Sequence, residues 1–337
     1  MPSQSGTLKS RTLVWGAMAA ALAVAVALYL GAPIYVLFVL NLLMTYAVLA
    51  IGLDVLLGRA GQFAFAHIAF YGIGIYTTGL LTNHTGVPVI FAIIAGGALA
   101  GIVGTLIAIP ATRLHSVYLA LATFAFAEAA QWVFNNWDSV TNGPNGLRIK
   151  SAHLFGYVIQ NDRDAFPLIV AVAVLMIAAT ALMARSQFGR AMEAIRESEH
   201  VALASGISVR RVKISAFAIS AIYAGIAGGM FTLFQSFVHP DSLGFDLIVL
   251  VLTMVVVGGL GSLTGVILGV VLLGLMPEVL RNFREWQELI YGLILILAVV
   301  FMPRGIWGLV VSLRRTPKNG TTDKTGAEAQ PASEHAP

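Results

Sequence analysis

The sequence contains no cysteine among its 337 residues. This absence excludes disulfide bonds, thiolate metal sites and cysteine nucleophiles from any account of what the protein does. Because cysteine usage carries no information here, the compartment has to be inferred from the way charge is distributed along the chain.

Charge is also scarce, since charged residues make up 11% of the chain and hydrophobic residues 58%. A soluble domain carries about 25% charged residues, so most of this chain is expected to lie in lipid. Stretches such as 17–30 and 247–257 are apolar on every face, unlike the alternating strands of a membrane barrel. The sequence therefore predicts an all-α fold, a polytopic bundle of transmembrane helices.

Apolar runs of about 20 residues mark the predicted spans, because that length crosses the hydrocarbon layer. The first run follows Lys9 and Arg11 and lacks a convincing signal-peptide cleavage site, so we interpret it as a span. The spans are expected at 14–31, 34–57, 63–82, 88–110, 116–135, 167–184, 214–237 and 288–302, with a longer apolar stretch at 245–276. The predicted organisation is a cytoplasmic segment at 1–13, a transmembrane domain at 14–313 and a disordered polar tail at 314–337.

The positive charges predict the orientation, because Lys and Arg of membrane proteins are retained in the cytoplasm. They concentrate in the loop 185–213 and near the C-terminus, so we expect both to be cytoplasmic, and we do not read the net charge of +4 as a sign of nucleic-acid binding. With both termini inside, alternating spans place 58–62, 111–115 and 185–213 in the cytoplasm and 83–87, 136–166 and 238–243 outside.

A single helix over 245–276 would put the basic C-terminus outside. The stretch is interrupted by a glycine-rich turn at 258–262, and two short passes meeting there restore an inside tail. We therefore predict ten membrane segments rather than nine. Glycine-broken segments are tolerated where backbone lines a cavity, so Gly259 and Gly261 mark either the transport pathway or a site of close helix packing.

The cytoplasmic loop 185–213 contains a predicted helix. From Arg190 to Ser205 it has no proline or glycine and is rich in strong helix formers, and Gly206 supplies a stop signal. The residues alone leave two readings open. The helix lies in the membrane interface as an anchor, or it docks a soluble partner.

Four sequence blocks carry a resemblance to a known family. They are FGRAMEAIRESEHVALASGI at 188–207, GRAGQFAFAHIAFYGIGIY at 58–76, VYLALATFAFAEAAQ at 117–131 with TNGPNGL at 141–147, and HPDSLGFDLIVLVLTMVVVGGLGSLTGVILG at 239–269. In order and spacing these resemble the LivM type of branched-chain amino acid permease, a membrane subunit of ATP-driven (ABC) importers. The departures are Val201 in place of an alanine, Asn142 and Pro144 in the 141–147 block, and the charge on Arg59.

The resemblance implies that the cytoplasmic helix is the coupling helix that sits in a cleft of an ATPase subunit. The positions that match the coupling pattern of the family are Glu199, Ala202 and Gly206, and the predicted coupling residues are these three together with Arg190 and Arg196. It also implies a bacterial inner-membrane location and a set of partners, namely a LivH-type second permease, two cytoplasmic ATPase subunits and a periplasmic solute-binding protein.

The chain itself has no phosphate-binding loop for ATP. Such a loop needs a glycine directly before its lysine, and no lysine of this sequence follows a glycine. We therefore expect a transport subunit that is not an enzyme and has no cofactor of its own, with ATP bound by partner subunits.

Ionisable groups within spans are costly and are default functional candidates. Asp54 and Asp246 lie near span ends, where interfacial water explains them. His67 is either part of a broken-helix site or a buried histidine bonded to a carbonyl, and Glu128 in mid-helix is expected to face the bundle interior, to bind an ammonium group or to join helices. The pathway candidates are Gly61, Gln62, His67, Glu128, Asn142, Gly259 and Gly261.

The sequence leaves two rival functions to consider. A gradient-driven secondary transporter or channel would use Asp54, His67 and Glu128 as a relay, but it has no need of a docking helix at 185–213. A membrane enzyme would need a metal or nucleophile motif, and the sequence has no HExxH motif. Among solutes, the residues do not separate branched-chain amino acids from urea, short amides or aromatic acids.

Overall fold

The computed structural model describes residues 29–114, 116–276, 286–301 and 306. The predicted cytoplasmic segment at 1–13, most of the first predicted span and the predicted tail at 314–337 lie outside the described residues. Within the described part the chain is mostly helical, with four two-residue strands, so the predicted all-α bundle is confirmed there.

Long helices occupy the predicted spans. They are α2 (Ile34–Leu53), which continues as the π-helix η1 (Asp54–Arg59), α3 (His67–Thr85), α4 (Val89–Ala111), α5 (Ser116–Asn136), α7 (Asp162–Arg185), α10 (Val209–Phe231), α11 (Phe245–Gly258), α12 (Leu263–Gly274) and α14 (Gln287–Phe301). Six segments in the described residues are long and apolar enough to cross a membrane, namely α2 with η1, α4, α5, α7, α10 and the stretch Pro240–Gly258. The predicted span at 63–82 is wrong at its start, because 61–66 are not helical.

The centre of the bundle is formed by α3, α4 and α10, which pack against one another through small residues. A side chain on Gly74 would overlap the backbone of Gly225, and one on Gly104 would overlap Ala221. Such close approach of backbones is how membrane helices associate without a hydrophobic driving force. α2 packs against this group and also contacts α7, α11 and α12.

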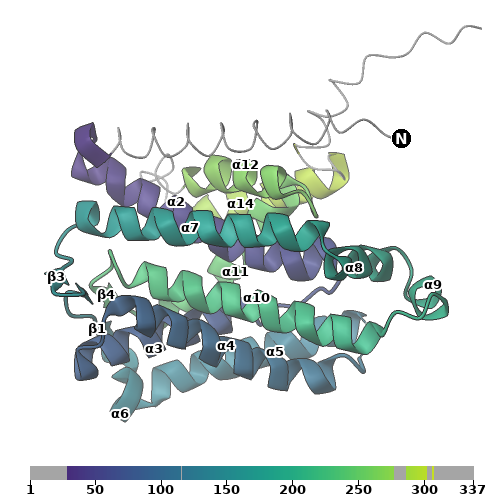
Figure 1. The fold of residues 1–337 in the computed structure, drawn as a ribbon, viewed down its shortest axis with the longest axis horizontal. Coiled ribbons are helices and arrows are strands. Elements are labelled where there is room, and N and C mark those ends of the chain that lie inside the picture. The colour runs from purple at the N-terminus through teal and green to yellow at the C-terminus, as the bar shows by residue number, and fades with distance from the viewer. Residues whose placement is uncertain (1–28, 115, 277–285, 302–305, 307–337) are drawn as a thin grey trace, which may run out of the picture.

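The loops gather at two opposite ends of the bundle, as Figure 1 shows. At one end, β1 (Leu147–Arg148) pairs antiparallel with β4 (Phe237–Val238), and β2 (His153–Leu154) forms a hairpin with β3 (Tyr157–Val158). The same end holds α6 (Asp138–Thr141) and the 3-10 helices η2 (Gly143–Asn145) and η3 (Pro240–Leu243). The Asn83 side-chain amide donates to the Arg148 carbonyl oxygen at 2.7 Å, which brings the 83–87 loop to this end as well.

The opposite end holds α8 (Gln187–Glu197) and α9 (Glu199–Ala204), together with residues 58–63 and 112–114. The three loops predicted to share the cytoplasmic side are therefore neighbours, and so are the three predicted to lie outside. Which end faces the cytoplasm, and how many segments cross the membrane in total, stay predictions.

The predicted break within 245–276 is confirmed. α11 and α12 are separate helices that pack side by side, with Gly258 against Gly265 and Gly269 against Met254. Helices of 14 and 12 residues extend about 21 and 18 Å, less than the hydrocarbon thickness of about 30 Å. Their connecting turn, 259–262, lies at the end of the bundle that holds α8.

Candidate functional site

The predicted coupling helix is two helices rather than one, so the expectation of a single helix over 190–206 is wrong. Ser198 has extended backbone angles (φ −161°, ψ 115°) and separates α8 from α9. Its N–H closes α8 by donating to the Ala194 carbonyl, and its hydroxyl accepts from the Val201 N–H at 3.4 Å to begin α9. Serine is a strong helix-capping residue, and this competition with helix propensity made the break.

The predicted helix stop at Gly206 is confirmed. Gly206 has φ +80°, its N–H donates to the Leu203 carbonyl, and the next N–H, of Ile207, donates to the Ala202 carbonyl. These two bonds form a Schellman motif, which requires a left-handed residue at the position of Gly206.

α9 presents apolar side chains away from the bundle. Val201 is 65% exposed and Leu203 56%, whereas Ala202 is buried against the chain itself. Ala202, a predicted coupling residue, therefore packs inward, and Val201, noted only as a departure from the family pattern, lies on the outer face. Exposed apolar groups beside Glu199 and His200 are typical of a protein-binding surface.

The other predicted coupling residues serve different contacts. Arg190 is exposed, and its guanidinium donates to the Arg185 carbonyl at 3.0 Å. The exposed Glu199 pairs with Lys213, whose own carbonyl accepts from the Gln62 side-chain amide at 3.2 Å. Arg196 points back toward the bundle, where its Nη1 donates to the Gly58 carbonyl.

The carboxylate of Asp54, which was expected to meet interfacial water, lies behind Arg196 in a buried position. Asp54 is 1% exposed, so interfacial water does not explain it, and it accepts a hydrogen bond from the Gly261 N–H at 2.7 Å. Arg59 Nε lies 3.6 Å from Asp54 Oδ2, and Arg59 Nη1 lies 3.8 Å from Glu193 Oε1 on α8. The π-helix η1 brings residues five apart onto one face, and the unusual charge on Arg59 was the signal that pointed here.

His67 is a buried histidine with both ring nitrogens occupied, as the structural reading expected. Nε2 lies 2.8 Å from the Leu49 carbonyl, which only accepts, so Nε2 carries the proton. Nδ1 therefore accepts from the Ser220 hydroxyl at 3.0 Å. This neutral imidazole joins α3 to α2 and α10, and neither of its ring nitrogens is free to bind a solute.

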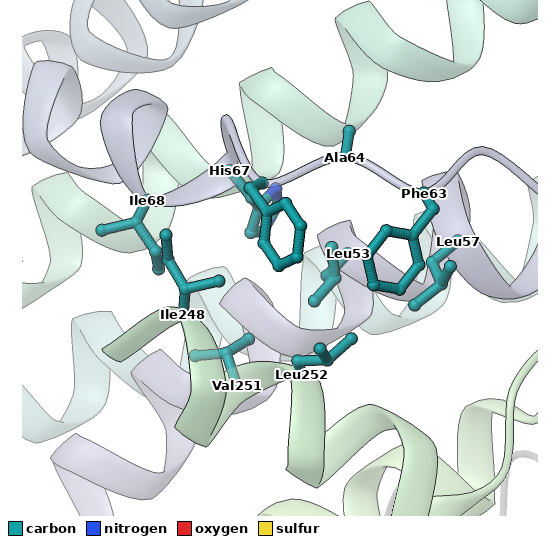
Figure 2. A pocket seen from close by; sticks show the side chains of 10 residues that line it. Leu53, Leu57, Phe63, Ala64, His67, Ile68, Ile248, Val251 and Leu252 are labelled. Carbon is teal, nitrogen blue, oxygen red and sulfur yellow. The ribbon is translucent and has the colours of Figure 1, made fainter. Parts of the chain in front are cut away.

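An apolar cavity lies beside His67 and is shown in Figure 2. It is lined by Leu53 and Leu57 from the α2–η1 segment, by residues 63–65, His67 and Ile68, and by Ile248, Val251 and Leu252 from α11. Its volume is about 10 Å³, the space of a single water at most. No amino acid fits in a cavity of this volume.

A larger open cavity of about 580 Å³ lies at the end of the bundle that holds α9. Gly61 and Gln62 line it on one side, and Glu199, His200 and Lys213 line it on the other. These two pathway candidates therefore lie next to the predicted coupling loop, with polar groups facing open space.

Glu128 does not face the interior of this chain, so that expectation is wrong. α5 is the least buried of the six candidate spans and packs through Leu119, Thr123, Ala127 and Phe134. Glu128 follows a buried residue by one position, about 100° around the helix, and is exposed. Another pathway candidate, Asn142, lies apart from Glu128 and caps α6 at the strand-bearing end. Asp246, the other ionisable residue near a span end, is exposed in the first turn of α11.

Comparisons with known proteins agree on one family. Residues 35–299 match the family model described as the branched-chain amino acid transport system permease component. The LivM permease protein of Escherichia coli K12 is 34% identical over 290 residues, covering 79% of this chain and 68% of that protein. The LivH permease protein of Salmonella typhimurium is 26% identical over 282 residues, covering 78% and 91%. No solved structure matches this chain.

Proposed function

Since this chain belongs to the permease family of branched-chain amino acid transport systems, we propose that it moves branched-chain amino acids across the bacterial inner membrane as one of two permeases in an ATP-driven importer. The observation that carries this proposal is the match to LivM-type permeases over most of the chain. The apolar outer face of α9 supports it, because a carrier that works alone has no need of such a surface.

The proposed partners of the cytoplasmic end are two ATPase subunits, which bind the ATP. Val201 and Leu203 would insert into a cleft of the ATPase, with Glu199 and Arg190 at the rim. Burial of two aliphatic side chains contributes about 1.5–3 kcal/mol each, whereas rim charges contribute little. Gly206 holds the end of α9 in the geometry that presents them.

The second proposed partner is a LivH-type permease on the exposed face of α5. The carboxylate of Glu128 in mid-span is costly to expose to lipid, so this face of α5 is expected to lie against another protein or along a polar path. We place the transport path along this face, with Glu128 available to the ammonium group of an amino acid. Gln62 and Gly61 would line its cytoplasmic mouth.

The proposed topology has ten membrane segments and both termini in the cytoplasm. The strand-bearing end, with loops 136–166 and 238–243, would then face a periplasmic solute-binding protein. The clustering of the basic loop 185–213 with 58–62 and 112–114 at the opposite end supports this orientation.

Affinity purification of the tagged chain from detergent-solubilised membranes tests the proposal. Recovery of ATPase subunits and of a second permease with the wild-type chain is expected. Loss of the ATPase subunits alone is expected for Val201→Asp, because a charge there has to be buried in the cleft. A wild-type chain that is recovered without either partner would contradict the proposal.

A further inference from the structure

We propose that Asp54, Arg59, Glu193 and Arg196 form a latch that fixes α8 to η1 and to the 259–262 turn and transmits the movement of α8 to both. The latch residues are positioning residues for transport. Neither of the two innermost, Asp54 and Arg59, is among the predicted coupling residues or pathway candidates, and Asp54 was considered only as a relay residue of the rival secondary transporter. This inference rests on the proposed function, since it assigns the route by which ATPase movement reaches the membrane segments.

Three segments far apart in the sequence meet at the latch. From α8, Arg196 donates to the Gly58 carbonyl, and Glu193 lies 3.8 Å from Arg59. From η1, Asp54 accepts from Gly261 of the α11–α12 turn at 2.7 Å. A displacement of α8 therefore acts on the end of η1 and, through Asp54, on the turn at 259–262.

This arrangement requires glycine at position 58 of η1 and at position 261 of the 259–262 turn. A Cβ on Gly58 would overlap the Asp54 carboxylate and lie 2.5 Å from the Gly261 nitrogen. A Cβ on Gly261 would lie 2.8 Å from Arg196 Nη1, at a backbone φ of +82° that favours glycine. At Gly58 the approach of the Gly261 backbone leaves no room for a side chain, and at Gly261 the left-handed backbone disfavours one.

Stability alone does not explain the buried charges. The side chains of Asp54 and Arg59 are 1% and 7% exposed, and burying an ion pair costs desolvation energy that its attraction often does not return. Asp54 Oδ2 and Arg59 Nε also lack a hydrogen-bond partner and are separated by 3.6 Å. The pair is therefore held near, but not at, hydrogen-bond distance, and a small shift of α8 can tighten or loosen it.

η1 and the 259–262 turn adjoin the segments that line the apolar cavity beside His67. η1 and the end of α2 supply Leu53 and Leu57 on one wall, and α11, which ends at the 259–262 turn, supplies Val251 and Leu252 on the facing wall. Because the latch joins the ends of both walls to α8, movement of α8 is expected to change their separation.

The test uses the assembled importer in proteoliposomes, with ATP hydrolysis and solute uptake measured on the same preparation. In Asp54→Asn and Arg196→Gln, hydrolysis is expected to continue while the solute carried per ATP falls about tenfold, within the range of coupling free energies between protein sites. Arg196→Lys keeps a donor for the Gly58 carbonyl and should recover much of the ratio. Arg210→Gln, an exposed arginine of the same loop that does not touch the latch, is the matched control.

Each outcome distinguishes the latch from the function on which it rests. Absence of ATP-driven uptake by the wild-type complex would defeat the proposed function itself. A wild-type complex that transports, together with Asp54→Asn and Arg196→Gln complexes of unchanged solute-to-ATP ratio, would overturn only the latch. If Asp54→Asn does not assemble, the test rests on Arg196→Gln, because Arg196 is largely exposed. Loss of the ATPase subunits from the Arg196→Gln complex would assign Arg196 to docking and would overturn its role in the latch.

Discussion

The Gly261 N–H donates to the Asp54 carboxylate at 2.7 Å across 207 positions of sequence. This bond joins the end of the first described membrane helix to the turn between two short helices near the other end of the chain. Arg196 of α8 reaches the same place, where it donates to the Gly58 carbonyl. The loop that is expected to meet the ATPase is thus in direct contact with η1 and lies beside the turn between α11 and α12.

Gly58→Ala tests the close packing at this contact. The added methyl group collides with the Asp54 carboxylate, and overpacking of this kind costs about 1–3 kcal/mol in the free energy of unfolding. We expect a lower thermal midpoint in detergent and loss of uptake. Gly31→Ala is the matched control, because a Cβ there meets nothing within 4 Å, and equal behaviour of the two variants would argue against the packing.

Gly206→Val and Gly206→Asn form a matched pair at the end of α9. Asparagine tolerates the left-handed conformation, whereas a β-branched residue is strained there by at least about 1–2 kcal/mol. We expect Gly206→Val to reduce recovery of the ATPase subunits and Gly206→Asn to retain it, with membrane insertion unchanged in both. A cleft-filling role for the residue at 206 itself would make the two variants fail alike.

The exposed face of α5 can be mapped with cysteines, since the chain contains none of its own. Ala125→Cys lies on the exposed side of the helix and Ala127→Cys on the buried side. We expect Ala125→Cys to cross-link to the second permease with a short bifunctional reagent and Ala127→Cys not to do so. Cross-linking from the buried position alone would place the interface elsewhere.

His67→Ala is expected to lower stability without changing which solute is transported. It removes the hydrogen bonds of His67 to the Leu49 carbonyl and from the Ser220 hydroxyl, each of which contributes about 0.5–1.5 kcal/mol. Less folded protein with an unchanged KM for uptake is the expected result. A raised KM at constant protein amount would return His67 to the transport path.

Orientation can be measured by labelling single cysteines with a membrane-impermeant reagent. Ser205→Cys next to α9 should react only from the cytoplasmic side, and Ser151→Cys at the strand-bearing end only from the periplasm. The expectation follows from the basic residues around α9. The reverse pattern would invert the proposed topology.

Length and hydropathy located most of the long helices. Runs such as 88–110 and 167–184 fall on α4 and α7, and the glycine turn before Leu263 does divide α11 from α12. These features are local, so they can be read from a short window. Charge distribution also grouped the loops correctly at two ends, because it reflects the alternation of consecutive spans.

The site was harder to predict because its contacts are long-range. Nothing local to Asp54 indicates a partner at Gly261, and a span that is apolar all round does not tell which side of α5 faces its own bundle, so the orientation of Glu128 was wrong. The break at Ser198 was missed for a different reason, since helix propensity was weighed above the capping ability of one serine.

Uptake by proteoliposomes tests the central claim most directly. They would contain this chain, the second permease and the ATPase subunits, with the solute-binding protein on the periplasmic side and labelled leucine as solute. We predict uptake that requires both ATP and the binding protein and that disappears with Val201→Asp. Uptake by this chain alone, driven by an ion gradient without ATP, would contradict the account.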